Sequence, residues 1–167
     1  MIKIPQPAMA INADDSPGPK YKMWNTRFVT RKDDPMWIMR NAAAVAKAAK
    51  GGKLHALVIN CHGSSGRLGL GTGIHRDNTD VFAELKGLVG DIYIIACETA
   101  YISGPRSSTD GNLFCGQIAK AAGAFVYAST ASQNTGLWPA IPYGYIDGYE
   151  GAVYRYKPDG SNELTKL

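Results

Sequence analysis

Two short apolar runs, each followed at once by a side chain that can do chemistry, constrain this chain more than any other feature. One run covers residues 54–60 and precedes His62, and the other covers residues 91–96 and precedes Cys97. Both are rich in β-branched residues and lack the alternation of a half-exposed strand, which indicates buried strands of a parallel sheet. Neighbouring strands lie about 4.8 Å apart. We therefore expect His62 and Cys97 to meet at the carboxyl edge of the sheet, where open α/β sheets bind ligands.

Helical patterns separate the apolar runs. Each predicted helix opens with a residue that can cap free amide groups, and the helices cover residues 36–50 after Asp34-Pro35, a segment after Asp77 or Asn78, and a segment from Asp110 to Gly123. Further strands are predicted at residues 124–129 and, as an edge strand, within residues 21–30. Such alternation implies right-handed crossovers and a sheet covered on both faces. The prediction is an α/β fold, a three-layer α/β/α sandwich with a mostly parallel central sheet.

The two ends of the chain differ from this pattern. Residues 1–20 are rich in proline and turn-forming residues, so they are interpreted as an extended arm. The carboxy-terminal region is rich in tyrosine and is punctuated by Asp147-Gly148 and Asp159-Gly160, which favours carboxy-terminal β-hairpins. At 167 residues the chain is most simply one domain spanning residues 1–167.

Composition narrows the function classes. The 45% hydrophobic and 19% charged content is ordinary for a globular protein, and the formal net charge of +4 is spread over scattered lysines and arginines. Without a basic run or a basic amphipathic helix, neither nucleic acid nor a membrane surface is an expected partner. No apolar stretch approaches the roughly 20 residues that span a bilayer, and the first residues lack a signal-peptide core. We expect a cytoplasmic location, or export without a cleaved signal peptide.

The three cysteines, Cys61, Cys97 and Cys115, do not have metal-ligand spacing, and each falls in or beside a predicted buried element. They are interpreted as reduced thiols, and no metal or other cofactor is expected. A thiol needs a base to act as a nucleophile at neutral pH, and His62 can supply it. The amides of Gly63 and Cys97 would then stabilise an oxyanion. The alternative is that Cys97 is a small buried hydrophobe and His62 a loop residue.

The motifs around these residues resemble a known family. Residues 61–64 (Cys-His-Gly-Ser) and 95–100 (Ile-Ala-Cys-Glu-Thr-Ala) are similar to the paired His-Gly and Ala-Cys-Glu-Thr signatures of CHAT domains. CHAT domains are related to the caspase-like cysteine peptidases, in which the histidine also precedes the cysteine on successive strands. The resemblance continues through residues 114–129 and covers about residues 54–133. It implies a caspase-like fold and a cysteine endopeptidase.

By this resemblance His62 is the general base and acid, Cys97 the nucleophile and Gly63 an oxyanion donor. The implied partner is a protein or peptide substrate, extended beside the sheet along residues 129–132 by strand addition. Substrate contacts are expected from Glu98, Ser129 and Thr130. The oligomeric state is left open by the sequence.

Two other functions fit the same residues. A caspase-like domain can also be catalytically inert and recruit a protein partner through its sheet edge or its tyrosine-rich tail. Alternatively, Cys61 and Arg67 have the spacing of Cys-x5-Arg phosphatases, in which backbone amides cradle a phosphate and the arginine clamps it. The segment after Arg67 is a poor helix start, which weakens this phosphatase interpretation.

Overall fold

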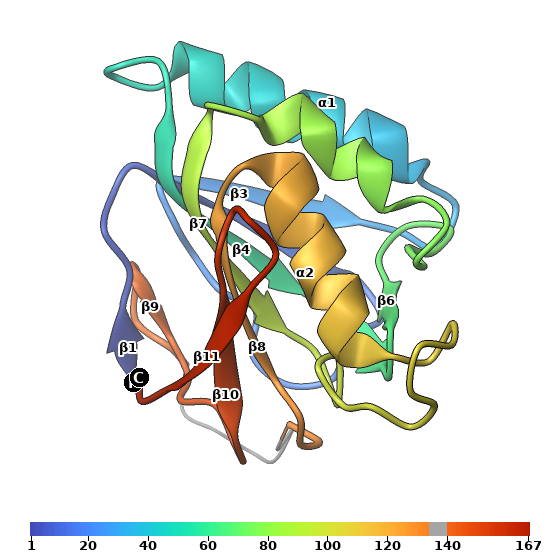
Figure 1. Ribbon diagram of the computed structural model, residues 1–167. Coiled ribbons are helices and arrows are strands. Elements are labelled where there is room, and N and C mark those ends of the chain that lie inside the picture. Colours follow the sequence, from blue (N-terminus) through green and yellow to red (C-terminus); the bar gives the residue numbers. More distant parts are fainter. Residues whose placement is uncertain (134–139) are drawn as a thin grey trace.

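The computed structural model describes residues 1–133 and 140–167, and its centre is a seven-stranded, mostly parallel sheet (Figure 1). The strand order is β11-β10-β8-β7-β4-β2-β3. The strands are β2 (Ala8–Ala13), β3 (Asn25–Val29), β4 (Leu54–Asn60), β7 (Val89–Ile95), β8 (Phe125–Ser129), β10 (Val153–Tyr156) and β11 (Asn162–Thr165). β3, β2, β4, β7 and β8 pair in parallel, and the β10–β11 hairpin joins β8 antiparallel.

The remaining elements are two small sheets and three helices. One small sheet pairs β1 (Ile2–Lys3) with β9 (Tyr145–Ile146), and the other is the hairpin of β5 (His62–Ser64) and β6 (Arg67–Gly69). The helices are α1 (Pro35–Ala48), the 3-10 helix η1 (Thr79–Leu85) and α2 (Gly111–Ala122). No helix of the described residues is both long and apolar enough to cross a bilayer.

Both long helices begin where the sequence predicts. The Asp34 side chain accepts a hydrogen bond from the Met36 amide at the start of α1, and Asp110 accepts one from the Leu113 amide at the start of α2. α2 ends at Gly123, whose φ of 60° lies in the left-handed region that glycine adopts without steric cost. The predicted strands at 54–60 and 124–129 and the edge strand within 21–30 are also confirmed.

The middle helix differs from the prediction. Instead of an α-helix capped by Asp77 or Asn78, residues 79–85 form η1. The Asn78 side chain does not cap this helix, because its Oδ1 accepts from the His75 amide and its Nδ2 donates to the Gly73 carbonyl. The side chains of Val81, Phe82 and Leu85 form the buried face of this helix.

The largest correction concerns the amino-terminal segment, which is not an extended arm. Residues 8–13 form β2, a fully buried strand that lies between β3 and β4 in the main sheet. Its sequence, Ala-Met-Ala-Ile-Asn-Ala, has weak strand propensity and is flanked by prolines. Burial overrides that propensity: Met9 and Ile11 pack on one face of the sheet, and Ala8 and Ala10 on the other.

The layer on each face of the sheet has a different composition. α1, η1 and α2 all contribute to one core, with Met9, Leu57 and Ile94 from the sheet. The opposite face is covered by the segment after β2, including Tyr21, and by the β1–β9 sheet, including Ile146. The sheet therefore has a layer on both faces, as predicted, but only one layer is helical among the residues that the structure describes.

Chain direction explains this asymmetry. The three helical connections run β3 to β4, β4 to β7 and β7 to β8, all in the same direction across the sheet. Right-handed crossovers that progress in one direction lie on the same face. The connection from β2 to β3 runs the opposite way, so residues 14–24 cross the other face. The connections leaving β2 and β4 thus diverge, and a crevice opens between the carboxyl ends of these strands.

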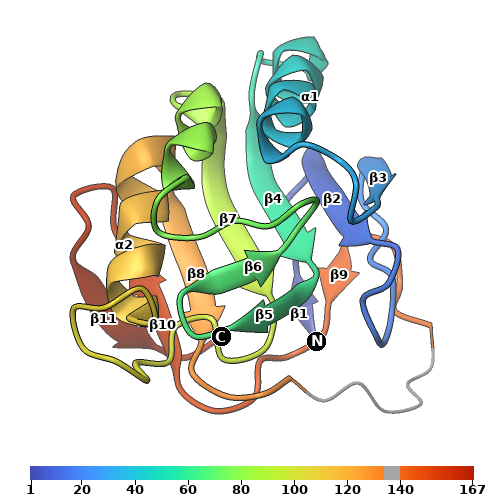
Figure 2. The same cartoon turned by 90° about the vertical axis from the view of Figure 1, so that its right-hand side faces the viewer.

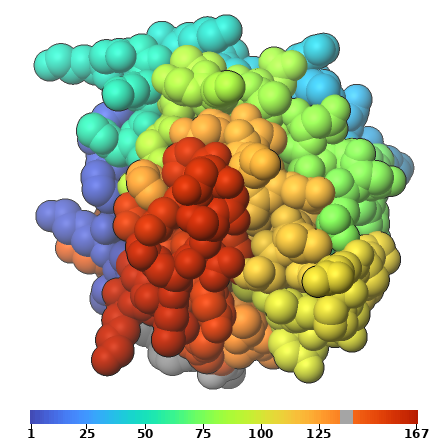
Figure 3. Space-filling view, viewed as in Figure 1, coloured from blue at the N-terminus to red at the C-terminus, as the bar shows by residue number. Residues whose placement is uncertain are grey.

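The carboxy-terminal prediction is confirmed in part. β10 and β11 form the expected hairpin around Asp159-Gly160, and β9 instead pairs with β1. The hairpin lies alongside α2 (Figure 3). A Cβ atom at Gly116 of α2 would lie 2.9 Å from the Gly160 carbonyl oxygen, so the absence of a side chain there allows this close packing.

A buried polar cluster holds the crevice between β2 and β4. Asn12 and Asn60 are register partners and are 0% and 3% exposed. Asn60 Nδ2 donates to Asn12 Oδ1 at 2.9 Å, and Asn12 exchanges two hydrogen bonds of 3.0 Å with the backbone of Tyr21. Asn60 also binds the Pro19 carbonyl and the Ser16 hydroxyl. The cluster therefore fixes the loop after β2 against the end of β4.

Replacing Asn12 by alanine tests this cluster. Asn12→Ala leaves the Tyr21 amide and carbonyl and the Asn60 side chain without their buried partner. We expect the free energy of unfolding in urea to fall by about 2–4 kcal/mol. The matched variant Asn162→Ala, at an exposed position in β11, should change it by less than about 0.5 kcal/mol. Equal effects of the two substitutions would contradict a structural role for the cluster.

Candidate active site at the carboxyl edge of the sheet

The paired strands bring His62 and Cys97 to equivalent positions. Asn60 of β4 is the register partner of Ile95 of β7, and the two residues of interest each lie two positions further on. The Cys61 amide continues the pairing by donating to the Ile95 carbonyl at 3.3 Å. His62 and Cys97 line the same small cavity, of about 30 Å³. The sequence-based expectation that they converge at one edge is therefore confirmed.

Gly63 allows the two chains to stay in contact beyond the strands. A Cβ atom at this position would lie 2.6 Å from the Cys97 carbonyl oxygen, 2.7 Å from the Ala96 Cβ and 2.8 Å from the Thr99 Oγ1. Real side chains do not tolerate such distances, so only glycine fits without movement of the turn that carries Cys97.

The Gly63 amide is directed away from its own hairpin. Leu68, its partner in β6, exchanges two hydrogen bonds of 3.0 Å with Ile74 on its other side. In an antiparallel pair the backbone groups of a residue face one side only, so Gly63 and Leu68 form a non-hydrogen-bonded pair. The Gly63 N–H group consequently points outward from β6 and is free of the β5–β6 ladder.

The turn after β7 is held rigidly. Glu98 has a φ of 52°, in the left-handed region that non-glycine residues rarely adopt. Its amide donates to the Ala131 carbonyl at 3.0 Å, and the Ala100 amide donates to the Ser129 carbonyl at 3.0 Å. The Glu98 carboxylate accepts from the Ser132 hydroxyl at 3.0 Å. These bonds attach the turn to the end of β8 and fix the backbone of Cys97.

The sulfur of Cys97 has a donor that the sequence did not indicate. The Gln133 amide donates to Cys97 Sγ at 3.3 Å, and the Gln133 side chain binds the carbonyls of Ala131 and Glu150. A backbone N–H group at this place faces the atom that carries negative charge in a thiolate. Backbone contacts of this kind have no sequence signature, which is why Gln133 was not identified beforehand.

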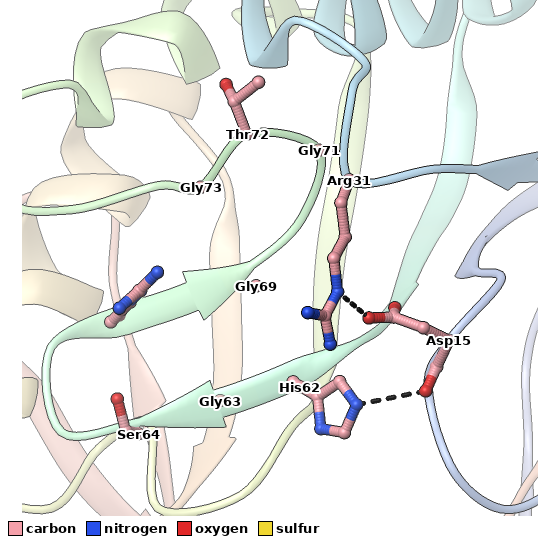
Figure 4. A pocket seen from close by; sticks show the side chains of 10 residues that line it. Asp15, Arg31, His62, Gly63, Ser64, Gly69, Gly71, Thr72 and Gly73 are labelled. Atoms are coloured by element: carbon pink, nitrogen blue, oxygen red, sulfur yellow. Dashed lines mark hydrogen bonds and ion pairs between the residues drawn. The ribbon is translucent and has the colours of Figure 1, made fainter.

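The ring of His62 is oriented by a backbone carbonyl. Its Nε2 lies 3.0 Å from the carbonyl oxygen of Asp15, and the ring points toward that residue (Figure 4). A carbonyl oxygen only accepts hydrogen bonds, so Nε2 must carry the proton, and in the neutral ring the lone pair is on Nδ1. Neither ring nitrogen is hydrogen-bonded to Cys97 Sγ in this structure, whose described residues include both side chains.

The loop that supplies the Asp15 carbonyl is anchored on both sides. The Asp14 amide donates to Val29, and the Ser16 hydroxyl donates to Asn60 Oδ1 at 3.1 Å. The Asp15 carboxylate pairs with Arg31, and this hydrogen bond lowers the pKa of Asp15, against the opposing effect of burial. Asp15 was not predicted as a site residue, because its contribution comes from the main chain.

Two of the expected substrate contacts have other roles. Ser129 is fully buried, and its hydroxyl donates to the Glu150 carbonyl. The Thr130 amide and hydroxyl both donate to Ala152. With the Ser129 and Ala131 carbonyls already bonded to the Cys97 turn, both edges of this segment are occupied. The strand addition predicted along residues 129–132 is therefore blocked at residues 129–131, where these backbone groups already have partners.

The other two thiols are core residues. Cys61 is 4% exposed and Cys115 0%. Burial raises the pKa of Cys61 to about 12 and also raises the pKa of Cys115. The phosphatase interpretation required Cys61 to be an anion beside Arg67 at the start of a helix. Instead, Cys61 faces the core and Arg67 lies in the hairpin strand β6, so this chemistry has no support from the geometry.

A second, larger cavity adjoins His62. Its volume is about 490 Å³, and it is walled by the β5–β6 hairpin, the glycine-rich segment after it, and the loops that carry Asp15 and Arg31 (Figure 4). Figure 2 shows the hairpin lying across the carboxyl ends of the parallel strands. Within residues 1–133 and 140–167, no cluster of three or more His, Cys, Asp or Glu side chains has the arrangement of a metal site.

The geometry predicts a selective thiol titration. Cys97 is half-buried, whereas Cys61 and Cys115 lie in the core. With a pKa of about 12, Cys61 is ionised in roughly one molecule in ten thousand at pH 8. We expect a chromogenic disulfide reagent to modify one thiol in the native protein and three after unfolding. Cys97→Ser should remove the fast-reacting thiol. A fast-reacting thiol that persists in this variant would contradict the assignment.

Gly63→Ala tests the contact between the hairpin and the Cys97 turn. The new methyl group would overlap the backbone of Cys97, so we expect the free energy of unfolding to fall by about 1–3 kcal/mol. Thermal or urea unfolding measures this loss. Gly148→Ala is the matched control, because a Cβ atom there meets nothing within 4 Å. A neutral Gly63→Ala variant would show that the two segments are not in close contact.

Comparisons with known proteins identify no relative of this chain. No family model, no curated protein and no solved structure matches the chain.

Proposed function

We propose that this protein is a cysteine peptidase of the caspase-like type, with Cys97 as the nucleophile and His62 as the general base and acid. The observation that carries the proposal is the register of β4 and β7, which gives His62 and Cys97 equivalent positions on one cavity. The orientation of the ring adds to it, since the Asp15 carbonyl leaves the lone pair on Nδ1. The CHAT-like motifs lie at the carboxyl ends of these same two strands.

The proposed reaction uses these groups in sequence. His62 Nδ1 takes the thiol proton, and the Cys97 sulfur attacks the carbonyl carbon of the scissile peptide bond. The resulting oxyanion is stabilised by the amides of Gly63 and Cys97. His62 then protonates the leaving amine, the C–N bond breaks, and a thioester remains on Cys97. Water, deprotonated by His62, hydrolyses the thioester and restores the thiol.

The free Gly63 amide supports the oxyanion assignment. Its N–H group is directed out of the hairpin, while its Cα is pressed against the Cys97 backbone. An oxyanion donor typically contributes about 10²–10³ in kcat. Glu98 and Thr130 remain proposed substrate contacts only through their positions beside the Cys97 turn. Ser129 is not proposed, since its side chain is buried.

A second candidate function is an inert domain that binds a protein partner. It is favoured by one observation, that the ring of His62 and the sulfur of Cys97 are not hydrogen-bonded to each other in this structure. Catalytic hydrogen bonds are often long without substrate and shorten when it binds. An electrophilic substrate analogue therefore distinguishes the two functions.

Covalent labelling tests the peptidase. We expect a peptidyl acyloxymethyl ketone to label the protein once, with the modification on Cys97 by mass spectrometry. Cys97→Ala should abolish labelling while the circular dichroism spectrum stays unchanged. Cys115→Ala, which removes a buried core thiol that lines neither cavity, should retain it. An unlabelled wild-type protein that still alkylates normally with iodoacetamide would favour the inert domain.

The role of His62 has its own kinetic signature. We expect His62→Ala to reduce kcat/KM for a cleaved peptide by about 10²–10⁴, because general acid–base catalysis contributes this much. The thermal unfolding midpoint should stay near that of the wild-type protein, since His62 is exposed. A decrease of less than about tenfold would remove His62 from the proposed mechanism.

A further inference from the structure

The cavity beside His62 has a distinct charge. Two guanidinium groups, those of Arg31 and Arg67, line it, and one carboxylate, that of Asp15, lines it as well. Asp15 is already paired with Arg31. Across residues 1–133 and 140–167, no carboxylate oxygen lies within 4 Å of the Arg67 guanidinium. The positive charge of Arg31 is therefore balanced by Asp15, whereas the guanidinium of Arg67 is available to a ligand.

The wall around Arg67 is rich in glycine. Gly73 lies beside the guanidinium, since a Cβ atom there would stand 3.9 Å from Arg67 Nη2 and 3.2 Å from His75 Nε2. Gly69 and Gly71 continue the same wall without side chains. The volume of about 490 Å³ accommodates the side chain of a bound peptide residue together with part of its backbone.

The position of the cavity relative to the two reacting groups indicates which part of a substrate enters it. Of these two cavities Cys97 lines the small one, whose lining among residues 1–133 and 140–167 includes no Asp, Glu, Lys or Arg side chain. His62 lines both cavities. The acyl part of a substrate bonds to the sulfur, and the leaving amine receives its proton from the imidazole. The residues after the scissile bond therefore extend from His62 into the large cavity.

We propose that this cavity is a subsite for an acidic residue on the leaving-group side of the substrate, with Arg67 as its main recognition residue. This inference rests on the proposed peptidase function and defines its substrate class. A guanidinium binds a carboxylate through two parallel N–H···O hydrogen bonds, which gives both affinity and geometric selectivity. The part of the small cavity at Cys97 that residues 1–133 and 140–167 line has no comparable charged group for the residue before the scissile bond.

Binding of leaving-group peptides tests the subsite without catalysis. The full chain carrying Cys97→Ala is titrated with the amidated tripeptides Glu-Ala-Ala and Gln-Ala-Ala, which have free amino termini. We expect the Glu peptide to bind about fivefold to tenfold more tightly, as a partly exposed carboxylate–guanidinium pair allows. This preference should weaken between about 0.05 and 0.5 M salt, because the Debye screening length falls from about 14 Å to about 4 Å. Equal affinities, or no binding of either peptide, would overturn the subsite.

Charge variants assign the effect to one arginine. Arg67→Gln should reduce the preference for Glu over Gln to less than about twofold. Arg40→Gln is the matched control, because Arg40 lies on α1, pairs at the surface with Glu84 and lines neither cavity. A preference that survives Arg67→Gln would overturn the role of Arg67. A preference that is lost in both variants would reduce the effect to general surface charge and overturn the subsite.

Turnover separates this inference from the function on which it rests. Three substrates share the same acyl half and carry Glu, Gln or Lys after the scissile bond. Their cleavage by the wild-type protein is compared. We expect kcat/KM to fall in the order Glu, Gln, Lys, and Arg67→Gln to reduce the value for Glu alone. Cleavage that depends on Cys97 but shows no preference for the residue after the scissile bond would overturn the subsite and leave the peptidase proposal intact. Charge-selective binding without any Cys97-dependent cleavage would overturn the peptidase and leave an acidic-peptide site.

Discussion

The in-register pairing of β2, β4 and β7 is the constraint on which the candidate site depends. Parallel strands that share a register end at the same edge, so the residues that follow them are brought together by the main chain alone. Asp15 follows β2, His62 follows β4 and Cys97 follows β7. A shift of one residue in either pairing would turn these positions to different sides of the sheet. The site is thus a consequence of backbone hydrogen bonding before any side chain is considered.

Buried polar groups and glycine adapt this edge for chemistry. Asn12 and Asn60 replace apolar residues at the ends of two buried strands, and their hydrogen bonds hold the loop whose carbonyl orients His62. Gly63 lets the hairpin approach the Cys97 turn to a distance that no side chain permits. The divergence of the chain after β2 and β4 opens the space that these groups surround. The geometry of the candidate site and the stability of the fold therefore depend on the same residues.

Much of the fold could be predicted from the sequence because its signals are local. Capping residues fixed the starts of α1 and α2, and the apolar runs located β4 and β7. β2 escaped prediction because Ala8–Ala13 becomes a strand only through burial between two neighbours, which propensity does not record. His62, Cys97 and Gly63 were identified from their side chains or lack of one. The Asp15 carbonyl and the Gln133 amide were not, since any residue type supplies these groups.

The central claim is that Nδ1 of His62 is the base for Cys97 while the Asp15 carbonyl holds Nε2. Nitrogen NMR of the protein with ¹⁵N-labelled histidine reads this arrangement directly, through the protonation of each ring nitrogen. We expect a His62 ring that carries its proton on Nε2 and a lone pair on Nδ1, because Nε2 faces the Asp15 carbonyl. A ring protonated on Nδ1 would contradict the proposed role of Nδ1 as the base.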